Sequence, residues 1–367
     1  MNGKPPFRAD HVGSLLRPQE LIAARHKLRN GEIDQSALRE IEDGAIRDVV
    51  KFQEDIGLRA VTDGEFRRGA FFSHFVKSVA GMTVKITPFM FSNDAGDNVQ
   101  AYGPYAAGKL KRAKGITTEE FKFVRAITDR TVKVTMPAPS YVNFLGGRER
   151  VDAAAYPDLT EYFVDLAAVY RQELAELHTL GCTFVQLDEV PLAMMEDPDI
   201  NDRIRSLGED PEQLIDVYIE AISAAVRDKP ADMVIGMHLC RGNYRGRWLA
   251  SGGYGRVAER IFNIKGIDVF FLEYDSPRAG DFSPLRLLPR AKWAILGLVS
   301  SKTAALEDKS AVLNRIDEAD KFVPIDQLGI SPQCGFATNL TGSPLTQAEE
   351  KAKLRLVVDI AAEVWGQ

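Results

Sequence analysis

The sequence is poor in cysteine and has neither an excess of positive charge nor a long apolar run. Its three cysteines among 367 residues are an odd number, which does not suit a disulfide framework, so thiol or metal chemistry is their better use. Lysine and arginine together number 46 against 52 acidic residues, giving a net charge of −6, so we expect no nucleic-acid partner. No apolar run approaches the roughly 20 residues that cross a bilayer, so we expect no membrane partner.

The amino-terminal residues 1–6 lack the apolar core of a signal peptide, which favours a cytoplasmic protein. The composition, 45% hydrophobic and 27% charged, is that of an ordinary globular protein. The length suits either two domains or one large α/β barrel.

Short apolar runs alternate with longer amphipathic stretches along the chain, which predicts strands alternating with helices. Eight strands are expected, at 7–14, 59–62, 132–136, 183–187, 234–240, 268–272, 293–299 and 328–330. Helices are expected at about 18–29, 35–56, 158–180, 211–227, 255–264, 308–321 and 346–364. The alternation breaks between about 76 and 115, where alternating apolar residues and glycines predict a β-hairpin insertion after the second strand. Such an insertion either covers a site or decorates the surface.

Polar and reactive side chains follow nearly every predicted strand, while apolar residues fill the strands themselves. A (β/α)8 TIM barrel has this pattern because its site is built from the loops that follow the strands, and we predict one such barrel over residues 1–367. An open doubly wound sheet is the main rival. Its best support is the stretch Gly253–Ala258, which fits a dinucleotide-binding fingerprint with Glu273 about twenty residues later. No convincing strand leads into Gly253, so this match is poor.

A candidate metal site follows from the barrel arrangement. His238 and Cys240 are two residues apart at the end of a strand, so their side chains point to the same side. The strands before Glu273 and Cys334 end at the same mouth of the barrel. Two thiolates, an imidazole and a carboxylate form a donor set that suits tetrahedral zinc. Asp275 competes with Glu273 for the carboxylate position, and the spacing does not separate the two.

The third cysteine, Cys182, lies at the entrance of a strand and is expected in the core.

The composition of the donor set also predicts a type of chemistry. Two thiolates donate more charge than the ligands of hydrolytic zinc sites, so such a metal suits a bound sulfur nucleophile better than an ionised water. Because a carboxylate is the weakest donor of the four, Glu273 is expected to yield its place to a substrate thiol. The residues therefore predict zinc-activated alkylation of a thiol.

Over nearly its whole length the chain resembles the C-terminal catalytic barrel of cobalamin-independent methionine synthase. The resemblance rests on five stretches, at 11–14, 61–65, 170–189, 237–240 and 331–335. It implies that the zinc ligands are His238, Cys240, Glu273 and Cys334. It also implies that the amino-acid part of homocysteine is held by Ser14, Glu65 and Asp188.

The chain also differs from that family. The full-length enzyme has two barrels, and one is expected here. Pro139 stands where the family has a pterin-stacking tryptophan, Lys302 stands near the position of its histidine, and residues 100–115 show no counterpart of its folate-contacting segment. Lys302 is our candidate catalytic residue, which would assist departure of the leaving group. The basic loop with Arg241, Arg245 and Arg247 either binds an anionic substrate or is solvated.

The resulting prediction is a zinc-dependent S-methyltransferase that resembles 5-methyltetrahydropteroyltriglutamate–homocysteine methyltransferase. It would methylate a small thiol, most simply homocysteine to give methionine, through a zinc-bound thiolate. The partners are then a small thiol and a methyl donor, either folate, a corrinoid or another molecule, and a homo-oligomer is the assembly to test for. Two alternatives remain at this stage: a zinc-dependent transferase of the epoxyalkane:coenzyme M type, and a non-catalytic zinc- or ligand-binding barrel.

Overall fold

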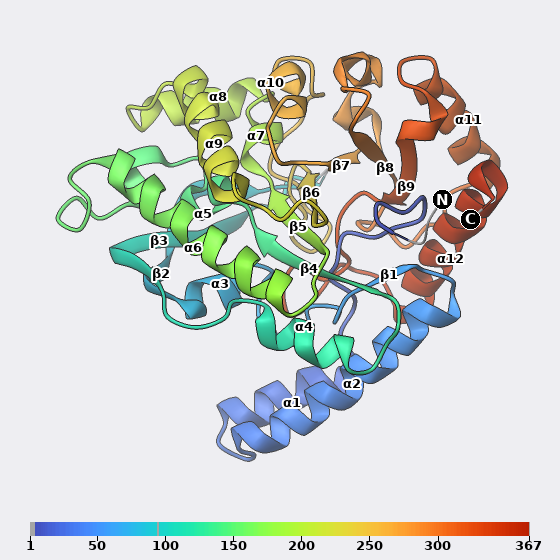
Figure 1. Ribbon diagram of the computed structural model, residues 1–367, viewed down its shortest axis with the longest axis horizontal. Helices are drawn as coiled ribbons and strands as arrows, with labels where there is room; N and C mark the ends of the chain where they lie inside the picture. The colour runs from blue at the N-terminus through green and yellow to red at the C-terminus, as the bar shows by residue number, and fades with distance from the viewer. Residues whose placement is uncertain (1–3, 94, 367) are drawn as a thin grey trace.

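A curled parallel sheet forms the centre of the molecule in the computed structural model, which describes residues 4–93 and 95–366 (Figure 1). Its seven strands are hydrogen-bonded in the order β1-β4-β5-β6-β7-β8-β9. They are β1 (Ala60–Val61), β4 (Thr131–Pro137), β5 (Phe184–Glu189), β6 (Val234–Leu239), β7 (Val269–Glu273), β8 (Trp293–Val299) and β9 (Leu328–Pro332). The strands are buried almost throughout, as expected for a parallel sheet covered by helices.

The segment 7–14 joins the two edges of this sheet and closes the barrel. Ala9 forms a parallel bridge with Ile330 of β9, so the eighth strand predicted here is reduced to one bridge. Side chains donate hydrogen bonds to backbone carbonyl groups of this segment, which in a longer strand would accept hydrogen bonds from the neighbouring strands. Lys133 of β4 donates to the carbonyl of His11, and Gln186 of β5 also donates to a carbonyl of this segment.

At the other edge, the hydroxyl of Thr62 donates to the carbonyl of Gly13 over 2.7 Å. The segment therefore lies between the first and last strands of the sheet, and the (β/α)8 barrel is confirmed. The rival open sheet is wrong, because a doubly wound sheet keeps two free edges. Residues 253–258 lie in the loop after β6 that leads into the short helix α10 (Ala258–Phe262), and they form no strand–helix turn.

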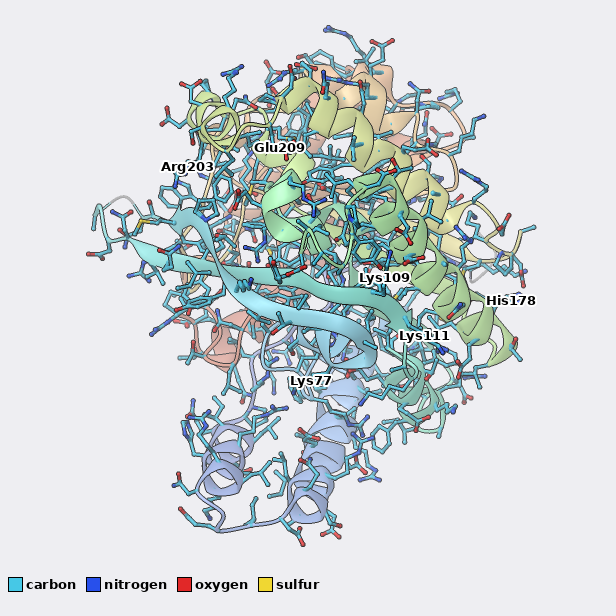
Figure 2. All side chains as sticks on the ribbon, turned by 90° about the vertical axis from the view of Figure 1, so that its left-hand side faces the viewer. Lys77, Lys109, Lys111, His178, Arg203 and Glu209 are labelled. Carbon is cyan, nitrogen blue, oxygen red and sulfur yellow. The ribbon has the colours of Figure 1, made fainter. Side chains whose placement is uncertain are left out.

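Helices surround the barrel, with α1 and α2 projecting from one side (Figures 1 and 2). The longer ones are α1 (Gln19–Arg29), α2 (Gln35–Asp55), α6 (Leu159–Thr179), α8 (Pro198–Ser206), α9 (Pro211–Val226), α11 (Lys309–Asp320) and α12 (Gln347–Trp365). The shorter ones are α3 (Ser73–Ser78), α4 (Thr118–Arg125), α5 (Pro139–Asn143) and α7 (Pro191–Met194), and four 3-10 turns lie at Gly147–Arg150, Pro277–Ala279, Ser283–Leu287 and Ile325–Gln327. Polar caps fix several helix starts: Asp34 accepts a hydrogen bond from the amide of Ala37, and Thr346 forms a capping box with Glu349.

The predicted insertion is a long antiparallel hairpin made of β2 (Val79–Phe91) and β3 (Val99–Arg112). Its two strands cross the front of the view in Figure 2. The far end of the hairpin is paired with the loop after β6, because Ser92 and Trp248 exchange backbone hydrogen bonds of 2.7 and 2.9 Å. This contact holds the hairpin against the loops that follow the strands.

Within the described ranges, no helix combines the length and the apolar character needed to cross a membrane.

Candidate metal centre and substrate cavity

Three predicted metal ligands come together where the loops follow β6 and β9. The donor atoms of His238, Cys240 and Cys334 all lie within 4.8 Å of one another, and all three residues are buried. β6 ends just after His238, and the alternation of the strand turns Cys240 to the same side. Cys334 arrives two residues after the end of β9. The strand ends predicted from the sequence therefore bring together a group of metal-binding type.

One thiol of this group is held ionised, whereas the hydrogen bond to Cys240 and burial raise the pKa of Cys334 well above its ordinary value. Hydrogen bonds from Cys334 and His238 hold the pKa of Cys240 well below its ordinary value, although burial opposes the shift. Both ring nitrogens of His238 are buried and have no hydrogen-bond donor or acceptor of ordinary geometry in the described structure, apart from the neighbouring thiol. A buried imidazole whose nitrogens are otherwise unused, next to a thiolate, fits the donor set of a zinc site.

Glu273 lies beside this group but turns its carboxylate toward cations. One oxygen accepts hydrogen bonds from Arg278 (2.7 Å) and Lys302 (2.9 Å), and the other from the backbone amide of Arg241 (2.6 Å). Burial alone would raise the pKa of Glu273, but the charges of Lys302, Arg241 and Arg278 hold it far below its usual range. Lys302 also contacts Asp275 at 3.2 Å. The role of Glu273 as a fourth ligand and that of Lys302 as an acid both stay predictions.

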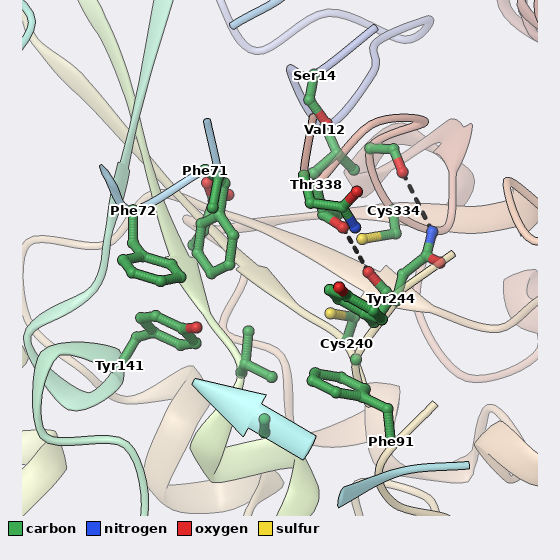
Figure 3. Close-up of a pocket in the computed structure, with 18 of the residues that line it drawn as sticks. Val12, Ser14, Phe71, Phe72, Phe91, Tyr141, Cys240, Tyr244, Cys334 and Thr338 are labelled. Atoms are coloured by element: carbon green, nitrogen blue, oxygen red, sulfur yellow. Dashed lines mark hydrogen bonds between the residues drawn. The ribbon is translucent and has the colours of Figure 1, made fainter. Parts of the chain in front are cut away.

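A cavity of about 260 Å³ opens next to the two cysteines (Figure 3). Its wall includes the sequence-predicted residues Ser14, Glu65, Asp188, His238, Cys240 and Cys334. Neither Glu273 nor Lys302 is among the described residues that line it. Three of the four proposed metal ligands thus share one cavity with the proposed homocysteine ligands.

Glu65 and Asp188 place two carboxylates in the wall of this cavity. Burial raises the pKa of both side chains, and the repulsion from Glu65 adds to the shift of Asp188, whose pKa is raised to about 7. One oxygen of Glu65 accepts a hydrogen bond from Thr135 (2.7 Å) and lies 3.3 Å from Arg68. Its other oxygen is buried without a hydrogen-bond partner among the described residues. An ammonium group would relieve both the repulsion and the missing hydrogen bond.

The backbone at Glu65 is itself unusual. Its φ of 59° lies in the left-handed region, which costs a non-glycine residue about 1 kcal/mol or more. Arg17 holds this conformation by donating to the carbonyls of Glu65 (2.8 Å) and Arg68 (3.0 Å). The strained turn aims the carboxylate into the cavity.

Ser14 contacts the loop that follows β9. Its hydroxyl oxygen accepts a hydrogen bond from the amide of Ala337 at 3.3 Å, so the hydroxyl proton remains for another acceptor. Gly335 comes so close that a Cβ built on it would lie 2.0 Å from this oxygen. A side chain at position 335 would therefore force the serine hydroxyl to move.

Sequence reasoning missed the aromatic wall of the cavity. Phe71, Phe72 and Tyr141 lie on one side, and Phe91 and Tyr244 lie on the other, beside the two cysteines (Figure 3). The pair Phe71–Tyr141 has ring centroids 4.6 Å apart, and Phe91 stacks on Tyr244 at 5.4 Å. The adjacent residues Phe71 and Phe72, which follow the Asp63-Gly-Glu65 turn, are the one sequence feature that indicates this wall.

The hairpin supplies part of the same wall. Phe91 of β2 and Gln100, Ala101 and Tyr102 of β3 all line the cavity. The insertion therefore covers the site, which settles an alternative that the sequence left open.

Two polar residues near the cysteines were also missed. Asn243 donates to the carbonyl of Gly335 (3.2 Å) and to Ser301 (3.0 Å), which ties together the two loops that carry the thiols. Glu189 follows Asp188 and accepts from the amide of Leu192, and burial raises its pKa to about 8. No local sequence pattern indicates either contact.

The three arginines of the predicted basic loop stand outside the cavity wall, as far as the structure describes it. Arg241 is buried and donates to backbone carbonyls, including that of Gly253 at 2.7 Å. Arg247 lies 3.6 Å from Asp97 at the end of the hairpin. Arg245 is exposed. These residues support the loop and the hairpin.

Comparison with known proteins identifies the family of the chain. Residues 7–363 match the family model for the catalytic domain of cobalamin-independent synthases. The uncharacterized protein YxjH of Bacillus subtilis (strain 168) is 41% identical over 99% of this chain and 96% of its own length. A methionine synthase of Pyrococcus abyssi (strain GE5 / Orsay) is 28% identical over 89% of this chain and 85% of its own length.

A solved structure gives the same result. The Listeria monocytogenes protein assigned as a vitamin-B12-independent methionine synthase superposes with a TM-score of 0.78, at 34% identity, covering 99% of both chains. The chain therefore belongs to the cobalamin-independent methionine synthase family.

Proposed function

We propose that this protein is a zinc-dependent S-methyltransferase that methylates homocysteine to methionine. One observation carries the proposal: the His238–Cys240–Cys334 group borders the cavity that also contains Glu65 and Asp188. A metal-binding group and a pair of carboxylates in one cavity suit a substrate with a thiol at one end and an ammonium at the other. Membership of the family, which includes the methionine synthase of Pyrococcus abyssi, supports the same reaction.

His238, Cys240 and Cys334 would hold the zinc ion. Three protein ligands are typical of catalytic zinc sites, in which a substrate or water completes the set. Zinc, when bound, lowers the pKa of a substrate thiol so that it is ionised at neutral pH, while thiolate ligands keep that sulfur nucleophilic.

The carboxylates and Ser14 would orient the amino acid. Glu65 and Asp188 bind its ammonium group, because each is buried and acceptor-rich and no lysine or arginine among the described residues lines the cavity. The hydroxyl of Ser14 donates to the substrate carboxylate, since its oxygen already accepts from Ala337. This leaves the side chain of the substrate directed toward the cysteines.

Glu273 and Lys302 would act through their neighbours. The ammonium of Lys302 already binds two carboxylates, so we assign it to holding Glu273 in place rather than to proton donation. The carboxylate of Glu273 also accepts the amide of Arg241, the residue after Cys240. The pair therefore positions the loop that carries a metal ligand. Glu273 lies close enough for its charge to act on His238 and both cysteines, so we keep it as the fourth ligand when substrate sulfur is absent.

The epoxyalkane:coenzyme M alternative is less well supported. The thiol of that reaction carries a sulfonate, which calls for arginine or lysine in the cavity wall. The described wall residues include neither type.

Zinc-edge absorption spectroscopy tests the proposal directly. The zinc-loaded protein is measured with and without homocysteine, and we expect one additional sulfur neighbour with the substrate. An unchanged shell would argue against homocysteine. Stoichiometric zinc without thiol-dependent turnover of any methyl donor would favour a non-catalytic zinc-binding barrel, and absence of zinc from protein purified without chelator would refute the metal assignment.

A further inference from the structure

We propose that the methyl donor is a small methylsulfonium ion, a sulfur cation that transfers one methyl group and leaves as a neutral thioether. This inference rests on the proposed function, because it concerns the second substrate of the same cavity. Three independent features of the cavity support it: its aromatic wall, its charge and its size.

The aromatic wall surrounds the position next to the thiol ligands. Phe71, Phe72 and Tyr141 face Phe91 and Tyr244 across the cavity, with Cys240 and Cys334 beside the second pair (Figure 3). Rings arranged around one space attract an onium group, because each ring presents a negative face to the cation. Their apolar surfaces also fit the methyl groups of the donor.

The charge of the wall disfavours an anionic donor, because its two carboxylates exceed the single ammonium charge of homocysteine and no described lysine or arginine lines it. Glu65 and Asp188 are acidic, and none of the wall residues in the described structure is lysine or arginine. A folate with a polyglutamate tail carries several carboxylates and would find no cationic partner in this wall. Arg247 of the basic loop lies 3.6 Å from Asp97 of the hairpin instead.

The size of the cavity points in the same direction. Its volume is about 260 Å³, whereas pockets for drug-sized ligands span about 300–1,000 Å³. Homocysteine must share this space with the donor. A sulfonium ion with three short substituents fits the remainder better than a pterin with its side chain.

The leaving group also fits the surroundings. The homocysteine sulfur forms a bond to the methyl carbon, the bond from that carbon to the donor sulfur breaks, and its electron pair stays on the donor sulfur. The donor leaves as a neutral thioether and needs no proton. Lys302, the residue that the sequence offered as an acid, is occupied by Glu273 and Asp275 outside the cavity wall.

Donor competition tests this proposal on the zinc-loaded full-length protein. Homocysteine is supplied with trimethylsulfonium, with tetramethylammonium, or with 5-methyltetrahydrofolate in its monoglutamate and triglutamate forms, and methionine is measured. We expect kcat/KM for trimethylsulfonium to exceed that for either folate by about tenfold or more, the scale of one lost cation–π contact or ion pair. Tetramethylammonium should compete with the sulfonium but transfer its methyl more slowly, because an amine is the poorer leaving group.

Faster turnover with either folate would overturn the proposal. So would homocysteine sulfur entering the zinc shell without any turnover of the sulfonium, and this outcome would leave the proposed function standing. Absence of sulfur from the shell would instead overturn the proposed function, and the donor assignment with it.

Aromatic variants and a neutral analogue test the recognition of charge. Phe71→Leu and Tyr244→Leu should each raise the KM for trimethylsulfonium about threefold to thirtyfold without changing zinc content. Phe163→Leu, on α6 and outside the cavity wall, is the matched control and should leave this KM unchanged. As inhibitors, choline should compete about tenfold more strongly than 3,3-dimethylbutan-1-ol, its neutral carbon analogue. Equal inhibition by the two alcohols, or equal effects of the control and cavity variants, would refute recognition of a cation.

Discussion

Replacing Glu65 with glutamine tests how the cavity binds an amino acid. The substitution keeps the size of the side chain and an oxygen for Thr135, but it removes one of the two negative charges in the wall. It also places amide protons near the expected ammonium group. A hydrogen bond to a charged group contributes about 1.5–3 kcal/mol, so KM for homocysteine should rise about tenfold to a hundredfold. Steady-state kinetics at saturating donor measure this change, and metal analysis should show unchanged zinc.

Glu120→Gln is the matched control, because both carboxylates contact the same guanidinium. Arg68 donates to Glu120 at 2.7 Å and lies 3.3 Å from Glu65, but Glu120 is not among the described wall residues. The control variant disturbs Arg68 and should lower stability more than it changes KM. If Glu65→Gln bound homocysteine as well as the wild type, or if Glu120→Gln lost as much affinity, the ammonium assignment would be refuted.

Three further predictions concern stability, fit and metal binding. Burial raises the pKa of Glu350 from 4.5 to about 8, so the folded state holds this proton more tightly than the unfolded state, and stability should fall as pH rises from about 4.5 to about 8. In Glu350→Gln the decrease in the free energy of unfolding between pH 5 and pH 9 should be smaller than in the wild type by up to about 5 kcal/mol. Urea unfolding at the two pH values measures this decrease, and an equal decrease in both proteins would contradict the prediction. In Gly335→Ala the new Cβ would lie 2.0 Å from the hydroxyl oxygen of Ser14, so the variant should weaken homocysteine binding more than zinc binding. Calorimetry that shows wild-type affinity for homocysteine would count against the close fit. Cys240→Ser should lose most bound zinc while Cys182→Ser, buried elsewhere, should keep it, and full zinc content in the former would remove Cys240 from the site.

The metal group could be predicted from the sequence because the loops that follow parallel barrel strands all lie at the same end of the barrel. His238 and Cys240 share one face of β6, and Cys334 follows β9, so the meeting of the three required only the strand assignments and the closed barrel. The surroundings of Glu273 could not be predicted in this way. Its partners Arg278 and Lys302 come from two irregular loops, and no periodicity relates such residues to the strand ends.

The first strand and the aromatic wall show the same limit. The apolar run at 7–14 predicts a strand, but Lys133 and Gln186 take its carbonyls, and side chains from other strands are not visible in a local pattern. Likewise Phe91 and Tyr244 stack only because the hairpin folds onto the loop after β6. The sequence indicated the hairpin itself, yet the surface that it covers depends on tertiary contacts.

The two halves of the site therefore differ in what determines them. The thiol half is set by β6 and β9, whose position in the barrel fixes His238, Cys240 and Cys334. The donor half is set by loops and by the hairpin, which is attached to the barrel at its far end through Ser92 and Trp248. A change in the hairpin would act most directly on the donor cavity, because the hairpin lines that cavity and contains none of those three metal ligands. The ends of the barrel strands thus carry information about the thiol, whereas the identity of the methyl donor must be argued from the wall that the hairpin completes.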